Sequence, residues 1–122
     1  EGGNLMLGIR KDNKGFYQGF TMTFKNGYGI SVQFGSGNYC SNKHLVRSNH
    51  HSLDGCVNCE TAIFKPNGKF LKYKGDDVQG YQTTDEVAET IAYIQTLEAN
   101  NYGRVSDDNS RTWTNKKYHK RY

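Results

Sequence analysis

An alternation of apolar and polar residues across residues 16–34 constrains the fold of this chain more than any other feature. Large apolar residues occupy even positions on both sides of an Asn-Gly pair, and small or polar residues occupy most of the odd ones. Alternation with a period of two, interrupted by Asn-Gly, is the strongest short-range signal for a β-hairpin. The sequence therefore predicts two antiparallel strands joined at Asn26-Gly27.

The register of this hairpin follows from the positions of its apolar residues. A two-residue loop at Asn26-Gly27 would turn the apolar residues of the two strands to opposite faces of the sheet. A three-residue loop over residues 25–27 instead pairs Phe24 with Tyr28 and puts all the large apolar groups on one face. We therefore predict a type I turn in which Gly27 takes the left-handed conformation as a bulge.

A second hairpin is predicted over residues 60–73, after three strands within residues 5–40. A Pro-Asn-Gly turn at residues 66–68 has the same three-residue form as the first turn, and it pairs Phe64 with Phe70. The pattern of this second hairpin is apolar on both faces, which favours a place in the middle of a sheet or under a helix or a partner subunit.

One amphipathic helix is predicted over residues 83–99, after a connector at residues 76–80. Thr83 followed by Glu86 forms a capping box, the signature of a helix start. Apolar residues recur at helical spacing at Val87, Ala88, Ile91, Ile94 and Leu97. We expect an α+β fold, in which a small antiparallel sheet of about five strands carries the helix on its apolar face. The whole chain, 1–122, is predicted to form a single domain that ends in a basic tail.

Residues 41–59 have no periodicity, and an irregular loop of this length in a small domain tends to be functional or held by a bound group. The pattern C-x3-H-x11-C-x2-C places Cys40, His44, Cys56 and Cys59 at its start, in it and at its end. Four such ligands suit a tetrahedral structural zinc ion, which would order the loop without a core. The alternative is a core cysteine at position 40 beside a mobile insertion.

The net charge of +4 lies entirely at the end of the chain. Residues 104–122 hold six Lys/Arg against two Asp/Glu, whereas residues 1–103 hold ten of each. The candidate ligand-binding residues interleave basic and aromatic side chains, and they are Tyr102, Arg104, Arg111, Trp113, Lys116 and Lys117. Guanidinium groups suit phosphates, and aromatic faces stack on bases. The alternative is a solvated tail, against which Trp113 argues because a lone tryptophan seldom lacks a packing role.

The composition also bears on where the protein works. Three cysteines are an odd count, which argues against a complete disulfide framework. No run of about 18 apolar residues predicts a membrane span, and no charged-then-apolar leader is visible at the start. We expect a cytoplasmic protein that has no contact with a membrane.

Two segments resemble small phage-encoded proteins. Residues 24–40 read F-x-NGY-x-ISVQFG-x-GNYC, and residues 76–88 read D-D-V-x-G-x-x-T-x-D-E-V-A. The resemblance covers about residues 16–98, with residues 41–59 as an insertion. Among such proteins the chain looks most like the Thoeris anti-defence family, which sequesters cyclic ADP-ribose-type signals and cyclic oligonucleotides in oligomer interfaces. The resemblance implies a non-enzymatic homo-oligomer of the host-cell cytoplasm that binds a nucleotide second messenger, and it transfers no site residue.

Two other functions stay open at this point. The first is a zinc-stapled protein that uses the same basic tail to bind nucleic acid or a nucleic-acid-bound defence complex, in the manner of an anti-CRISPR protein. The second is an interaction protein whose second hairpin, apolar on both faces, pairs with another subunit.

Overall fold

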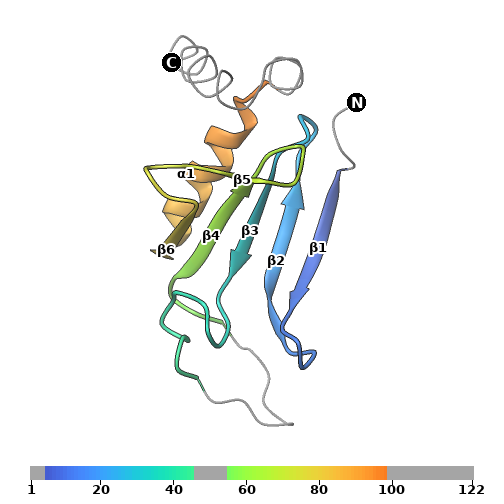
Figure 1. Cartoon of the computed structure of the whole chain (residues 1–122). Helices are drawn as coiled ribbons and strands as arrows, with labels where there is room; N and C mark the ends of the chain where they lie inside the picture. The colour runs from blue at the N-terminus through green and yellow to red at the C-terminus, as the bar shows by residue number, and fades with distance from the viewer. Residues whose placement is uncertain (1–4, 46–54, 99–122) are drawn as a thin grey trace.

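The computed structural model describes residues 5–45 and 55–98, and these residues form an antiparallel sheet with one helix on it (Figure 1). Within these ranges the elements are β1 (Met6–Lys11), β2 (Tyr17–Thr23), β3 (Gly29–Gln33), β4 (Cys59–Phe64), β5 (Phe70–Leu71), β6 (Val78–Gln82) and α1 (Thr84–Gln95). The strand order is β1-β2-β3-β4-β5, and β6 pairs with β4 beside β5. The α+β fold with a small antiparallel sheet is confirmed.

The register of the first hairpin is the predicted one. The Phe24 N–H donates to the Tyr28 carbonyl at 2.8 Å, and the Gly27 N–H donates to the Phe24 carbonyl at 2.8 Å. Gly27 has a φ of 92°, in the left-handed region that a glycine adopts without strain. Phe20 pairs with Val32, so the large apolar side chains of β2 and β3 share one face.

The second hairpin also has the predicted register. Phe64 pairs with Phe70, and their rings stack with centroids 5.0 Å apart. Gly68 closes the turn with a φ of 88°, and its N–H donates to the Lys65 carbonyl at 2.8 Å. The two hairpins therefore use the same turn device, although β5 is only two residues long.

The connector predicted at residues 76–80 is wrong in its second half, where β6 begins at Val78. This strand pairs with the first half of β4 and lies beside the turn that follows β3. The Tyr81 N–H donates to the Tyr39 carbonyl at 2.9 Å, and a Cβ at Gly80 would lie 3.0 Å from the Tyr39 Cβ. The missing side chain at position 80 therefore allows a close approach that holds β6 against the sheet.

Helix α1 begins at the predicted capping box. The Glu86 N–H donates to the Thr83 hydroxyl at 3.2 Å, and the Thr83 N–H donates to a Glu86 carboxylate oxygen at 2.9 Å. The predicted apolar stripe is right except at Ala88, which is exposed. Thr90 is buried instead, and its hydroxyl donates to the Glu86 carbonyl at 2.9 Å. A threonine can be buried in a helix because the carbonyl one turn earlier satisfies its hydroxyl.

The helix ends at Gln95, four residues before the predicted end at residue 99. Asn26, in the turn of the first hairpin, donates its side-chain amide to the carbonyls of Ile94 and Leu97 at 2.9 Å each. Carbonyls at a helix end need partners from outside the helix. Asn26 provides two such bonds, and thereby ties the end of α1 to the sheet.

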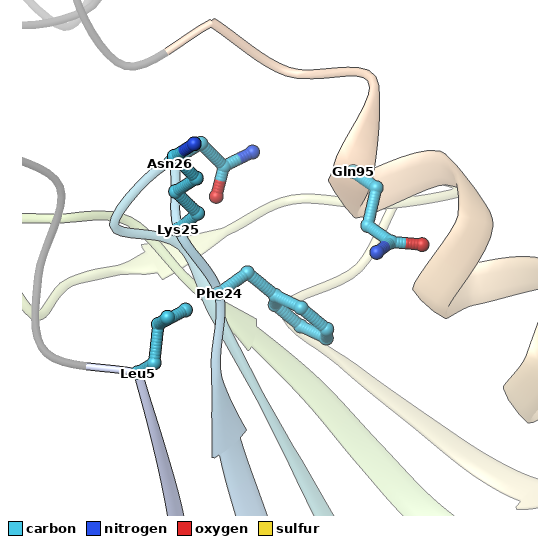
Figure 2. Close-up of a pocket in the computed structure, with 5 residues that line it drawn as sticks. All are labelled: Leu5, Phe24, Lys25, Asn26 and Gln95. Atoms are coloured by element: carbon cyan, nitrogen blue, oxygen red, sulfur yellow. The ribbon is translucent and has the colours of Figure 1, made fainter.

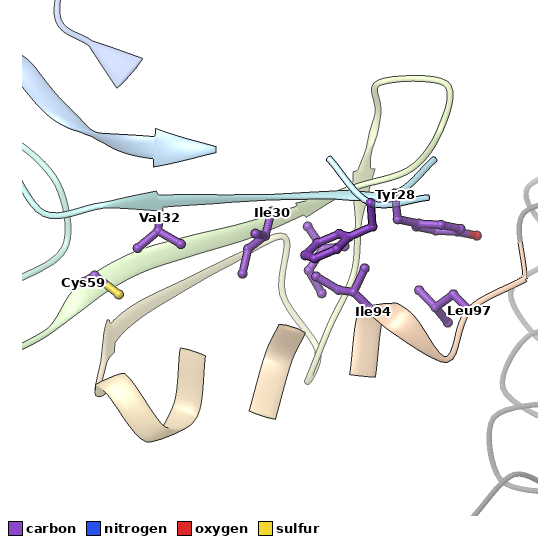
Figure 3. Close-up of a cluster of buried hydrophobic side chains, with 8 residues drawn as sticks. Tyr28, Ile30, Val32, Cys59, Ile94 and Leu97 are labelled. Carbon is purple, nitrogen blue, oxygen red and sulfur yellow. The ribbon is translucent and has the colours of Figure 1, made fainter. Parts of the chain in front are cut away.

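The core lies between the helix and the middle of the sheet (Figure 3). Its buried members are Phe24, Tyr28, Ile30, Val32, Cys59, Ile63, Ile94 and Leu97. The same face of the sheet continues over β2 and β1, where Leu7 pairs with Met22 and Ile9 pairs with Phe20. Leu7 and Ile9 are 74% and 65% exposed. The helix thus covers only half of the apolar face. In the described part of the chain, no helix has the length and apolar character to cross a membrane.

Candidate functional site

Two of the predicted metal ligands, Cys40 and Cys56, are brought close together. Each thiol affects the pKa of the other, although sixteen positions separate them in the sequence. Cys40 is only 1% exposed, and its Sγ also lies 3.6 Å from the Gly35 carbonyl oxygen as a donor. The first cysteine of the pattern therefore lies near the second, at the base of the irregular loop.

Hydrogen bonds hold the two segments that carry these thiols. The Ser41 N–H donates to the Asn58 side-chain carbonyl at 2.7 Å. The Asn42 side-chain amide donates to the Gly55 carbonyl at 3.0 Å and to the Phe34 carbonyl at 2.8 Å. The turn that follows Cys40 is therefore fastened both to β3 and to the segment before β4. Asparagine supplies these bonds because its short amide side chain reaches backbone groups that no strand satisfies.

Cys59 packs in the core, and its role differs from that of the other two cysteines. It is a member of the buried cluster under α1, and its Sγ lies 3.5 Å from the Gln82 carbonyl oxygen (Figure 3). Burial, with a smaller contribution from the neighbouring cysteines Cys40 and Cys56, raises the pKa of the Cys59 thiol to about 11. This cysteine is a neutral packing residue at neutral pH.

His44, the second residue of the predicted zinc set, is exposed. Across residues 5–45 and 55–98, no group of three or more His, Cys, Asp or Glu side chains is arranged to hold a metal ion. Of the four predicted ligands, the structure therefore joins only Cys40 and Cys56. Structural zinc in this loop stays a prediction.

The paired thiols differ in their surroundings. Burial raises the pKa of Cys40 above its ordinary value. Burial also acts to raise the pKa of Cys56, but the backbone N–H groups of Asn58, Asn42 and Ser41 and the nearby Cys40 thiol lower it overall. Donors that point at a sulfur atom favour its thiolate form. Cys56 is thus the thiol of the pair that ionises more readily.

Cys56 also borders a cavity of about 380 Å³ on the helix side of the sheet. The cavity is mostly apolar, and its walls include Phe20, Val32, Phe34, Cys56, Cys59 and Val87. It lies where the first turn of α1 faces β2 and β3. Sequence patterns do not reveal this cavity, because its walls come from four separate parts of the chain.

A second cavity, of about 400 Å³, lies at the other end of the sheet, beside the end of α1 (Figure 2). Leu5, Phe24, Lys25, Asn26 and Gln95 line it. Gln95 stands three residues before Glu98, the last residue that the structure describes. The described part of the chain therefore ends three residues after a residue that lines this cavity.

The six residues predicted to bind a ligand all lie outside the described residues. They are Tyr102, Arg104, Arg111, Trp113, Lys116 and Lys117. Their roles stay predictions that rest on charge and residue type. Lys25 and Gln95, which sequence reasoning did not single out as site residues, are polar side chains of the described domain that line the second cavity.

Comparisons with known proteins complete the description of the site. The resemblance to small phage-encoded proteins, and among them to the Thoeris anti-defence family, stays a prediction from the sequence. The antiparallel sheet and single helix are compatible with many functions, since a fold alone does not define one. Searches against protein-family models, curated proteins and solved structures returned no match for this chain.

Proposed function

We propose that the protein binds and sequesters a phosphate-bearing nucleotide, of the cyclic ADP-ribose or cyclic oligonucleotide type, without catalysis. The observation that carries this proposal is the segregation of charge. The whole net charge of +4 lies in residues 104–122, in a stretch that also holds Trp113. A concentrated positive charge attracts phosphates, and the accompanying aromatic side chains offer faces on which a base stacks.

Each candidate residue has a role in this proposal. Arg104 and Arg111 pair with phosphate oxygens, because the planar guanidinium group donates two parallel hydrogen bonds. Tyr102 and Trp113 stack on the base. The lysine pair at residues 116–117 adds positive field, which raises the local concentration of an anionic ligand.

The cavity at the end of α1 supports this proposal from the described domain. Its volume of about 400 Å³ falls within the usual range for small-molecule pockets, which is roughly 300–1,000 Å³. Lys25 brings an ammonium group to it, and Gln95 brings an amide that both donates and accepts hydrogen bonds. Both groups are suitable partners for the polar atoms of a nucleotide.

Calorimetric titration tests this function directly. We expect cyclic ADP-ribose-type and cyclic oligonucleotide ligands to give heat with the wild-type protein. Arg111→Ala should weaken binding about tenfold or more, since a hydrogen bond to a charged group contributes roughly 1.5–3 kcal/mol. Lys69→Ala, which removes one positive charge from an exposed turn, is the matched control and should bind like wild type. No heat with any of these ligands would contradict the proposal.

The part of the apolar sheet face that α1 leaves uncovered, over β1 and β2, supports assembly into a homo-oligomer. Leu5, Leu7 and Ile9 are exposed on β1 or just before it, and β1 is the last strand of the path. An edge strand offers unpaired backbone groups, and an apolar face beside it favours burial against a second copy.

Light scattering should then give an oligomer for the wild-type protein and a monomer for Leu7→Lys/Ile9→Lys. The matched control is Met6→Lys, which adds a charge to the opposite face of the same strand and should leave the oligomer intact. A wild-type protein that stays monomeric at high concentration would contradict assembly through this face.

The same charge distribution favours a second candidate, which is binding to a nucleic acid or a nucleic-acid-bound complex. The logarithm of polymer affinity falls linearly with the logarithm of salt concentration, with a slope set by the number of phosphates contacted. A single nucleotide contacts few phosphates and depends less on salt. Titration of both ligand classes at several salt concentrations separates the two functions.

A further inference from the structure

Cys40 and Cys56 lie on two hydrogen-bonded segments within the connection between β3 and β4. We propose that Cys40 and Cys56 form a reversible intramolecular disulfide when the protein meets a peroxide, and that Cys59 remains a thiol. Within the described residues all three cysteines are free. Cys40 and Cys56 lie on neighbouring segments, which are joined by hydrogen bonds of 2.7 Å from the Ser41 N–H to the Asn58 side chain and 3.0 Å from the Asn42 amide to the Gly55 carbonyl. The proposed bond is a covalent modification site that uses none of the residues proposed to bind a nucleotide.

The backbone around the pair holds the two sulfur atoms near each other. Cys40 lies in a tight turn, where the Lys43 N–H donates to the Cys40 carbonyl at 3.0 Å. That turn is tied to the segment of Cys56 through the Ser41–Asn58 bond at 2.7 Å. The backbone therefore holds Cys40 and Cys56 on adjacent segments, and a disulfide forms when their sulfur atoms close to about 2.05 Å.

Access decides which sulfur reacts first. Cys56 is half-buried and borders the cavity of about 380 Å³, which has room for a molecule as small as hydrogen peroxide. Cys40 is 1% exposed, so the peroxide reaches Cys56 before it reaches Cys40. Cys59 also borders this cavity, but it is buried and its thiol donates to the Gln82 carbonyl at 3.5 Å within the core.

The chemistry balances with hydrogen peroxide as the two-electron oxidant. The Cys56 sulfur attacks one peroxide oxygen, the O–O bond breaks, and a sulfenic acid and one water form. The Cys40 sulfur then attacks the Cys56 sulfur, the S–O bond breaks, and a second water leaves with the remaining thiol proton. Both S–H bonds are lost and one S–S bond is made. A dithiol reductant reverses the change by thiol–disulfide exchange.

The bridge would also change stability, because it closes a loop of 17 residues counted from Cys40 to Cys56. A crosslink of this span restricts the unfolded chain. We expect the Tm of the oxidised protein to exceed that of the reduced protein by roughly 10 °C.

The test uses the full chain, first reduced and then treated with hydrogen peroxide. Remaining thiols are blocked with N-ethylmaleimide, and intact mass is followed by peptide mapping. We expect one labelled thiol per chain, a loss of two hydrogen masses, and a crosslink that dithiothreitol removes. No Lys or Arg separates Cys56 from Cys59, so a tryptic map alone cannot tell these two partners apart.

Two variants assign the partners. Cys59→Ala should keep the crosslink to Cys40, and Cys56→Ser should lose it. Cys56→Ser changes a half-buried residue, so it should fold even if a variant of buried Cys40 does not. Three labelled thiols after oxidation, a crosslink that survives in Cys56→Ser, or equimolar zinc that protects Cys40 and Cys56 from the peroxide would each overturn the proposal.

Discussion

Replacing Gly19 with alanine is expected to destabilise the fold by about 3 kcal/mol or more. Gly19 has a φ of 151°, and a Cβ at this position would overlap the Val32 carbonyl oxygen and lie 2.9 Å from the Gln33 Cα. These atoms belong to the backbone of β3, so the overlap can be relieved only by moving β2 away from β3. The free energy of unfolding, measured in urea for wild type and variant, tests this expectation.

Gly37→Ala is the matched control for Gly19→Ala. Gly37 also has a positive φ, of 86°, but nothing lies within 4 Å of a Cβ built there. The free energy of unfolding of this variant should fall by only about 1 kcal/mol, which is the cost of alanine in the left-handed conformation. If both substitutions lowered the free energy of unfolding equally, the close approach of β3 to Gly19 would have no energetic role.

Replacing Ile94 with alanine is expected to cost about 2–5 kcal/mol, the usual range for truncating a fully buried isoleucine. Ile94 is 0% exposed and lies between α1 and the sheet (Figure 3). Its loss leaves a cavity at the centre of the core. Chemical unfolding gives the change in free energy, and circular dichroism at the same denaturant concentrations reports whether helix and sheet are lost together.

Gln95→Ala, one residue further along α1, separates packing from helix propensity. Gln95 is exposed, and alanine is the better helix former, so this variant should stay within about 0.5 kcal/mol of wild type. A small loss for Ile94→Ala, close to that of the control, would show that the helix contributes little to the stability of the sheet.

The parts of the fold that the sequence predicts well are those with local causes. The register of each hairpin depends on a three-residue turn and on alternation in the strands next to it, and Gly27 and Gly68 have the conformations expected of them. The start of α1 depends on Thr83 and Glu86, which are three residues apart. Nothing distant has to be known to derive any of these features.

The parts that the sequence predicts poorly depend on contacts across the fold. The end of α1 is set with the help of Asn26, which lies 68 residues before Ile94 and gives no local signal of a helix stop. Strand β6 has no alternation of apolar residues, and it is held through Tyr39 and β4. Contacts of this kind join residues that are far apart in the sequence and meet only when the sheet is complete, so no local sequence pattern predicts them.

The predicted site shows the same division. The spacing of the cysteines directed attention to Cys40 and Cys56, which the structure joins. It did not reveal that Cys59 packs in the core, although one signal was present: Cys59, Thr61 and Ile63 alternate along β4 and share its helix-facing side. For Cys59, the alternation of residues along β4 is therefore a better guide to its position than its spacing from the other cysteines.

The bonds from Asn26 to the end of α1 also imply an order of assembly. The β2–β3 hairpin is local and can close within microseconds, whereas the helix must find its place across a long stretch of chain. The carbonyls of Ile94 and Leu97 obtain the Asn26 amide only when the turn that carries it has formed. We infer that the hairpin forms first and acts as the template on which the last turn of the helix docks.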